Sequence, residues 1–255
     1  MSADTPLGEV HLPVAYEPVY LATCDSALNA AVRRAEAGAP EGTLVWAGTQ
    51  TRAQGRLGSR WMSPADGLYC AVVLRPDIPT TRLGEFVPLA TVAAGTALAE
   101  LVVPMTDLRF RWPNAVYLSG GRAAGNWVSA GSDWLVVATS INVASTSDAD
   151  DFGHACISTE GGAPEVSVAL TLETYLRHLT DWLACWDEEG LAPILRHLRI
   201  RAQQQGDETT LYLPGDTVVT GRFVAIDNTG DLQLDTVDGS RTLGLNAYMG
   251  LPPSA

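Results

Sequence analysis

The 255-residue sequence contains no lysine, so arginine supplies all 16 of its basic side chains. Against 29 acidic residues, these leave a formal net charge of −13 at pH 7. The backbone of a nucleic acid is bound mainly through Lys and Arg, and a protein this acidic repels it over long range. The composition therefore argues against nucleic acid as the main partner.

Long apolar runs and paired cysteines are also missing. No run of about 18 apolar residues is present, and the N-terminus lacks the basic start and apolar core of a signal peptide. Cys24, Cys70, Cys156 and Cys185 form no CxxC pair, and the four histidines lack the spacing of metal ligands. We therefore expect no membrane partner, no metal site, and core cysteines in a reducing cytoplasm.

The pattern of apolar and turn-forming residues predicts a mixture of helices and strands up to about residue 205. Helical periodicity and capping residues predict helices at 26–37, 83–102, 171–189 and 193–204. Apolar runs between short turns predict strands at 44–47, 68–74, 108–110, 115–118, 125–128 and 134–143, with 68–74 buried on both faces. Only short strands follow, at 209–213, 217–226, 232–236 and 241–245.

The most informative segment is the loop at residues 50–61, which contains two glycines and three arginines. Glycine lets a backbone approach a ligand closely, and arginine matches phosphate oxygens in pairs. Gly55 and Arg56 lie at its centre, and Trp112, Pro113 and Asn114 follow about fifty residues later. A basic loop on an acidic body predicts a small anionic ligand, most plausibly a nucleotide.

The order of these motifs resembles the catalytic domain of the biotin protein ligases, within the wider biotin/lipoate ligase family. The likeness extends from about residue 17 to residue 245. The matching landmarks are Gln50 and Thr51, Gly55 and Arg56, Trp61, Ser63 and Pro64, Gly67, Trp112 to Asn114, Ala124 and Gly125, and Ile141 to Val143. Each motif is weak alone, but their order and spacing together are specific.

The resemblance implies an α+β fold in two parts. Residues 1–205 would form a class II synthetase-like biotin/lipoate ligase catalytic domain, a mixed sheet with helices. Residues 206–255 would form a small SH3-like β-barrel. Ligases of this family join a carboxylic acid to the α-phosphate of ATP, forming an acyl-adenylate, and then pass the acyl group to a lysine of a carrier protein. The implied ligands are ATP with Mg²⁺ and biotin or a lipoate-like acid. The implied partner is a carrier-protein acceptor, and the chain would be a monomer or a homodimer.

The family's functional residues can be carried over position by position. Arg122 occupies the position of the catalytic lysine, and Arg56 that of a loop arginine that contacts phosphate; both are expected to be catalytic. The expected substrate-binding residues are Ser26, Gln50, Gly55, Trp61, Trp112, Asn114, Gly125 and Asn142. No metal ligand is expected among the protein side chains.

Several family positions are changed in this chain. Arg122 replaces a lysine, and Ala115 replaces the aspartate that follows Trp-Pro-Asn. Further changes are Gln54 for a loop arginine, Ala27 and Leu28 for Thr-Asn, and Ala138 and Ser140 for glycines. Arginine and lysine are not interchangeable at a tight phosphate site. Three interpretations follow: a ligase of ordinary type, a ligase for a different acid, and a binding protein that keeps the fold without the chemistry.

Overall fold

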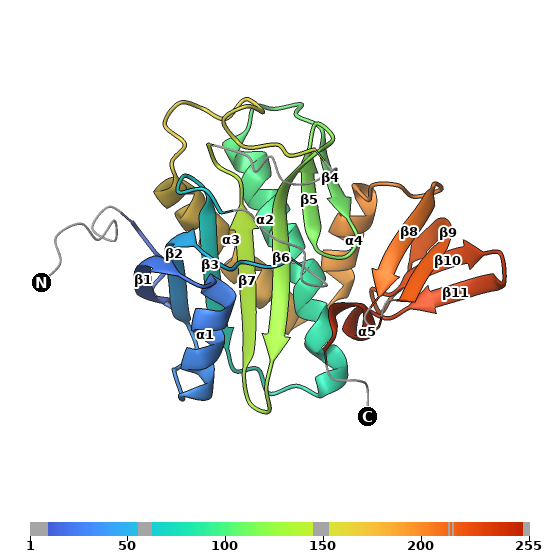
Figure 1. The fold of residues 1–255 in the computed structure, drawn as a ribbon, viewed down its shortest axis with the longest axis horizontal. Coiled ribbons are helices and arrows are strands. Elements are labelled where there is room, and N and C mark those ends of the chain that lie inside the picture. The colour runs from blue at the N-terminus through green and yellow to red at the C-terminus, as the bar shows by residue number, and fades with distance from the viewer. Residues whose placement is uncertain (1–9, 56–62, 145–152, 214, 216, 252–255) are drawn as a thin grey trace, which may run out of the picture.

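The computed structural model describes residues 10–55, 63–144, 153–213, 215 and 217–251. Its larger part is a seven-stranded mixed sheet in the order β1-β2-β3-β7-β6-β5-β4 (Figure 1). β1 and β2 are parallel, and the remaining neighbours are antiparallel. The strands are β1 (Glu17–Cys24), β2 (Thr43–Gln50), β3 (Leu68–Leu74), β4 (Leu108–Arg111), β5 (Ala115–Leu118), β6 (Gly121–Ala130) and β7 (Leu135–Ile141).

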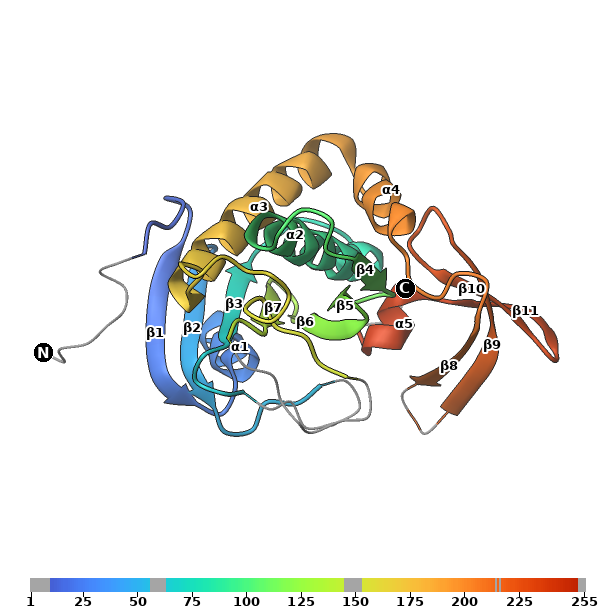
Figure 2. The ribbon, with the colours of Figure 1, turned by 90° about the horizontal axis from the view of Figure 1, so that it is seen from above.

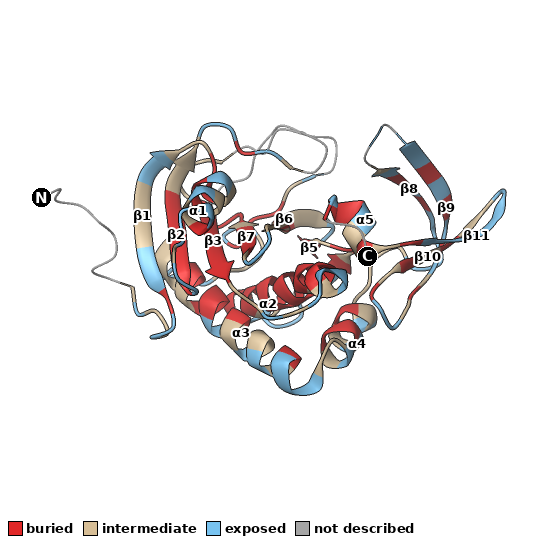
Figure 3. Cartoon of the chain, turned by 90° about the horizontal axis from the view of Figure 1, so that it is seen from below, coloured by how far each residue is buried: buried red, intermediate tan, exposed pale blue. Residues whose placement is uncertain are grey.

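Helices cover both faces of this sheet. α2 and α3 lie on one face and α1 on the other (Figure 2). α2 is buried along most of its length (Figure 3). The helices are α1 (Ala27–Glu36), the 3₁₀ helix η3 (Thr80–Glu85), α2 (Phe86–Leu101), α3 (Val168–Glu189), α4 (Ala192–Ile200) and α5 (Leu245–Met249).

Two apolar layers hold the helices to the sheet, and β3 belongs to both. Cys70 and Val72 point into the layer under α2 and α3, whereas Tyr69 and Ala71 point into the layer under α1. Successive side chains of a strand alternate between faces, so an unbroken apolar run is required when both faces are covered. All of β3 is buried, which confirms the strand predicted to be buried on both faces.

The predicted helices are present, with shifted ends. Ser26 caps α1, as its position before an alanine-rich run indicates. The helix expected at 83–102 is divided, because its first turns form η3 and α2 begins only at Phe86. Pro88 then lies in the first turn of α2, where its missing N–H has no helical partner to lose. α4 ends at Ile200, short of the predicted residue 204.

The sequence analysis missed two elements. β1 is an edge strand with no buried residue, and its apolar run is limited to the four residues from Val19 to Ala22. α5 follows Gly244, where the sequence had suggested that the last strand continues to residue 245. That strand, β11 (Gly239–Leu243), begins two residues earlier than expected.

The C-terminal strands form a separate four-stranded antiparallel sheet in the order β11-β10-β9-β8. The other three strands are β8 (Glu208–Leu213), β9 (Thr217–Ile226) and β10 (Leu232–Thr236). Among the described residues this sheet is open, with β8 and β11 at its two edges. The SH3-like barrel, and a domain boundary at residue 205, therefore stay predictions.

No helix in the described part of the chain is long and apolar enough to span a membrane. The four cysteines are free; Cys70 and Cys156 are buried, as expected of core thiols. Cys24 and Cys185 are partly exposed, so the core assignment is wrong for them. Cys185 lies on α3, where a side chain one position away from the buried stripe reaches solvent.

Candidate functional site

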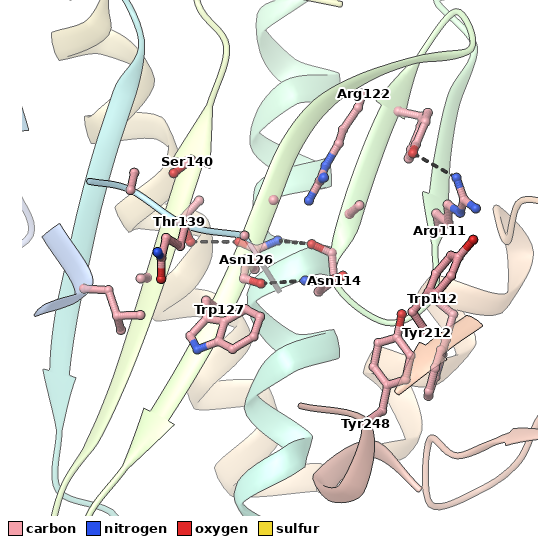
Figure 4. A pocket seen from close by; sticks show the side chains of 18 of the residues that line it. Arg111, Trp112, Asn114, Arg122, Asn126, Trp127, Thr139, Ser140, Tyr212 and Tyr248 are labelled. Carbon is pink, nitrogen blue, oxygen red and sulfur yellow. Dashed lines mark hydrogen bonds between the residues drawn. The ribbon is translucent and has the colours of Figure 1, made fainter. Parts of the chain in front are cut away.

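A cavity of about 720 Å³ lies between the large sheet, the start of α1 and the C-terminal sheet. Figure 4 shows residues from β4 to β7, β8 and α5 around it. Of the predicted site residues, those that line it are Ser26, Gln50, Gly55, Trp112, Asn114, Arg122 and Gly125. Arg56 and Trp61 lie outside the described residues. Segments distant in sequence thus converge on one cavity.

The start of α1 forms one end of the cavity, and its polar groups are already engaged. Ser26 Oγ accepts a hydrogen bond from the Asn29 amide at 3.0 Å. Gln50 Oε1 accepts from the Ala27 amide at 2.8 Å, and Gln50 Nε2 donates to Ser63 Oγ at 2.9 Å. Both side chains therefore satisfy backbone amides that a helix start leaves without partners.

Arg122 is turned toward the cavity by a β-bulge. Val116 pairs with Ala124, but Tyr117 pairs with Arg122, which leaves Ala123 as an extra residue in β6. Strict alternation would place Arg122 on the face opposite Gly125. The extra residue reverses this parity, so both residues line the cavity. The Arg122 side chain extends toward Asn126 and Asn114 in Figure 4.

Asn142 is not among the cavity-lining residues, but it hydrogen-bonds to the backbone of Arg122. Its side chain is buried, and its amide nitrogen donates to the backbone oxygens of Arg122 (3.1 Å) and Ala155 (3.0 Å). The sequence analysis expected Asn142 to bind substrate directly. The described geometry instead gives its side-chain amide a part in holding the Arg122 backbone.

Trp112 joins the cavity wall to the C-terminal sheet. Its indole nitrogen donates to the Gly230 carbonyl oxygen at 2.8 Å, and its ring lies 4.6 Å from that of Tyr248. Asn114, two residues later, donates from Nδ2 to the backbone oxygen of Asn126 at 2.9 Å. The turn between β4 and β5 is thus fixed on both sides.

A chain of buried hydrogen bonds runs beneath the cavity, on the opposite face of the sheet. Asn126 Oδ1 can only accept, so Thr139 donates to it at 2.8 Å. The Thr139 oxygen must then accept from Tyr175 at 2.6 Å. Asn126 Nδ2 donates to Thr91 at 3.2 Å, and Thr91 donates to the Pro113 carbonyl oxygen at 3.1 Å. Burial raises the pKa of the Tyr175 hydroxyl well above its ordinary value, which keeps this donor protonated.

The charge of the cavity wall is opposite to that of the whole protein. Arg111 and Arg122 line it, whereas Glu208 is the single carboxylate among the described lining residues. Arg111 also donates to the Tyr117 hydroxyl at 3.2 Å. On a chain of net charge −13, two guanidinium groups gathered in one cavity favour an anionic ligand.

Several lining residues were not expected from the sequence. They are Arg111, Tyr117, Trp127, Tyr248 and, from β8, Glu208 to Tyr212. The position of Arg111 beside Trp112 could have suggested it. The residues of β8 and α5 reach the cavity only because the C-terminal sheet packs beside it, which no local pattern reveals.

Comparison with known proteins agrees with this architecture. The family model described as the biotin/lipoate A/B protein ligase family matches residues 12–199. The chain belongs to this family.

Some proteins similar to this chain match it over most of the length of both chains. The biotin–[acetyl-CoA-carboxylase] ligase of Paracoccus denitrificans is 31% identical over 226 residues, which are 84% of this chain and 92% of that protein. The Aquifex aeolicus biotin protein ligase, solved with biotin and ATP, has a TM-score of 0.75 at 24% identity, covering 91% of this chain and 96% of that chain.

A biotin protein ligase-like protein of unknown function from Silicibacter sp. TM1040 has a TM-score of 0.76 at 22% identity. The match covers 94% of this chain and 99% of that chain. At these identities the structural likeness shows the fold. The mixed sheet with helices on both faces is therefore the ligase fold, as the sequence predicted.

Proposed function

We propose that this protein activates a carboxylic acid with ATP as an acyl-adenylate and transfers the acyl group to an amine, such as a lysine of a carrier protein. The proposal rests chiefly on Arg122, which a bulge turns into a cavity of about 720 Å³. That volume falls in the range of small-molecule sites. The ligase fold and the relative named for biotin transfer support the proposal.

Arg111 and Arg122 would stabilise the negative charge that develops during adenylation. Adenylation places negative charge on the α-phosphoryl oxygens, and preorganised cations at a partly enclosed site stabilise that charge most effectively. Gly125, on the same face as Arg122, leaves room for a ligand close to the backbone. Trp112 and Tyr248 offer aromatic rings to a nucleotide base.

Magnesium would have few protein ligands here. Ala115 lines the cavity in β5, at the position where the family resemblance implies an aspartate, and Glu208 is the only carboxylate among the described lining residues. Magnesium is usually held by one or two carboxylates together with substrate phosphates. In this site most of its ligands would be phosphate oxygens and water.

Alanine at position 115, where the resemblance implies an aspartate, also supports a second candidate function. The protein would then bind an acid or an adenylate without forming one, as a binding module on the ligase scaffold. Arg122 in place of a lysine is consistent with either function, because it keeps the charge but changes the reach.

Exchange of labelled pyrophosphate into ATP separates the two functions. A ligase shows exchange that depends on an added acid, and the Arg122→Gln variant should lower it at least 100-fold, because removing one stabilising donor costs about that much. Arg241→Gln, on an exposed strand away from the cavity, is the matched control and should leave exchange unchanged. A folded protein that binds acid but shows no exchange would support the binding module instead.

A further inference from the structure

The α1 end of the cavity has an apolar wall. Ala27, Leu28 and Ala138 line it and pack in the same cluster between α1 and the sheet. Trp127 is paired with Ala138 across β6 and β7 and lines the same wall. Ala53 adds a buried methyl group from the loop after β2. A ligand group at this end therefore meets mainly carbon.

Four of the polar side chains that line this part of the cavity have partners within the protein. Ser26 caps α1, and Gln50 binds the Ala27 amide and Ser63. Thr139 and Asn126 border the cavity, but they hydrogen-bond to Tyr175, to Thr91 and to each other on the other face of the sheet. Their hydrogen-bonding capacity is directed away from the ligand.

A polar ring would be poorly matched to such a wall. The ureido ring of biotin carries two N–H donors and a carbonyl acceptor, and each needs a partner when it is buried. Ser140, which lines the cavity from β7, offers one hydroxyl, and Gln54, beside Ala53, offers an amide at an exposed position. An unsubstituted hydrocarbon chain needs no partner and gains from contact with the apolar wall.

We propose that the acid bound here is an aliphatic monocarboxylic acid. Its hydrocarbon tail lies against Leu28 and Ala138, and its carboxylate points toward Arg122. This inference deepens the proposed function and rests on it for the role of the acid, but binding of the acid can be measured without any chemistry. It separates this protein from the relative named for biotin transfer.

The first test is calorimetric titration of the full chain with octanoate and, separately, with biotin. We expect octanoate to bind at least tenfold more tightly, because a buried polar ring without partners is rejected by about that factor or more. Biotin binding equal to or tighter than octanoate, or binding of neither acid, would overturn the inference. Octanoate binding without octanoate-dependent pyrophosphate exchange would support the assigned class of acid and refute the ligase proposal. Pyrophosphate exchange that depends on biotin and not on octanoate would support the ligase proposal and refute the assigned class of acid.

The second test changes the length of the tail site. Ala138→Leu should fill part of the apolar end, so the ratio of octanoate to butanoate affinity should fall at least tenfold. Ala22→Leu, at an exposed position of β1, is the matched control and should leave the ratio unchanged. A general loss of stability lowers both affinities and does not change their ratio. An unchanged ratio in Ala138→Leu would refute the assigned position of the tail.

Discussion

Asn126 carries a buried amide in a layer that is otherwise largely apolar, and its neighbours depend on it for partners. Asn126→Leu would leave the Thr139 hydroxyl without its acceptor and remove a donor to Thr91. We expect a loss of about 1–3 kcal/mol in the free energy of unfolding. Tyr175→Phe removes only the hydroxyl that donates to Thr139 and should lower the free energy of unfolding by about 0.5–1.5 kcal/mol. Urea titrations of both variants check this order, and an equal or larger loss in Tyr175→Phe would contradict the assigned donor directions.

His197 gives the protein a predictable response to acid. Its ring lies against those of Trp182 (5.4 Å) and Phe110 (6.2 Å). Burial, followed by the charge of Arg201, lowers the pKa of His197 below its ordinary value of 6.5. The unfolded chain therefore takes up a proton first as the pH falls through 6.5, and the folded state loses stability there.

The substitution His197→Phe removes this titration and keeps an aromatic ring. Between pH 7.5 and pH 5, wild-type protein should lose more stability than the variant, as measured by urea titrations at the two pH values. His11→Gln, at an exposed position, should follow the wild type. Parallel pH dependence in wild type and His197→Phe would show that another group controls the acid response.

At the scale of elements, α1 depends on the cap at its start. Ser26→Ala removes the oxygen that accepts from the Asn29 amide, and should lower the free energy of unfolding by about 1 kcal/mol. Ser26→Gly should cost less, because glycine is itself an acceptable cap. Thermal unfolding of both variants gives the comparison. Equal losses would mean that the Gln50 contact with Ala27 supports this helix start without the hydroxyl.

The elements that the sequence predicted well are those whose own residues determine them. β3 is apolar throughout because both faces are covered, and α3 repeats its buried residues at helical spacing and ends at Gly190. β1 was missed because an edge strand needs no buried residue. The bulge at Ala123 was missed because it is a property of pairing between two strands, and it decides where Arg122 points.

Only part of the site was predicted, because some of its features depend on contacts between distant segments. The resemblance brought Ser26, Gln50, Trp112 and Arg122 to one place, and all four line the cavity. It could not show that Ser26 and Gln50 engage the start of α1. It also could not show that β8 supplies a wall, because that depends on how the C-terminal sheet packs.

At the scale of the whole molecule, Trp112 links the two sheets. We expect wild-type protein to unfold in a single calorimetric transition, because buried contacts of Trp112 with Gly230 and Tyr248 couple the two parts. Trp112→Ala removes these contacts, should cost about 3–5 kcal/mol, and should separate the unfolding of the C-terminal sheet from that of the large sheet. Trp112→Phe loses the hydrogen bond to Gly230 but keeps an aromatic ring beside Tyr248, and should retain one transition. A single transition in Trp112→Ala would place the coupling elsewhere, for instance in the hydrogen bonds of Asn246 to η3.

If the protein forms an acyl-adenylate, as proposed above, the absence of lysine has a chemical consequence. Acyl-adenylates modify any nearby unprotonated amine, and a lysine beside such an intermediate is an obvious target. Apart from its four histidines, every basic side chain of this protein is a guanidinium, which stays protonated and does not attack a carbonyl carbon. A mixed anhydride formed beside Arg111 and Arg122 would thus be neutralised by cations that cannot take its acyl group, and no lysine amine of the protein itself would compete with an outside amine.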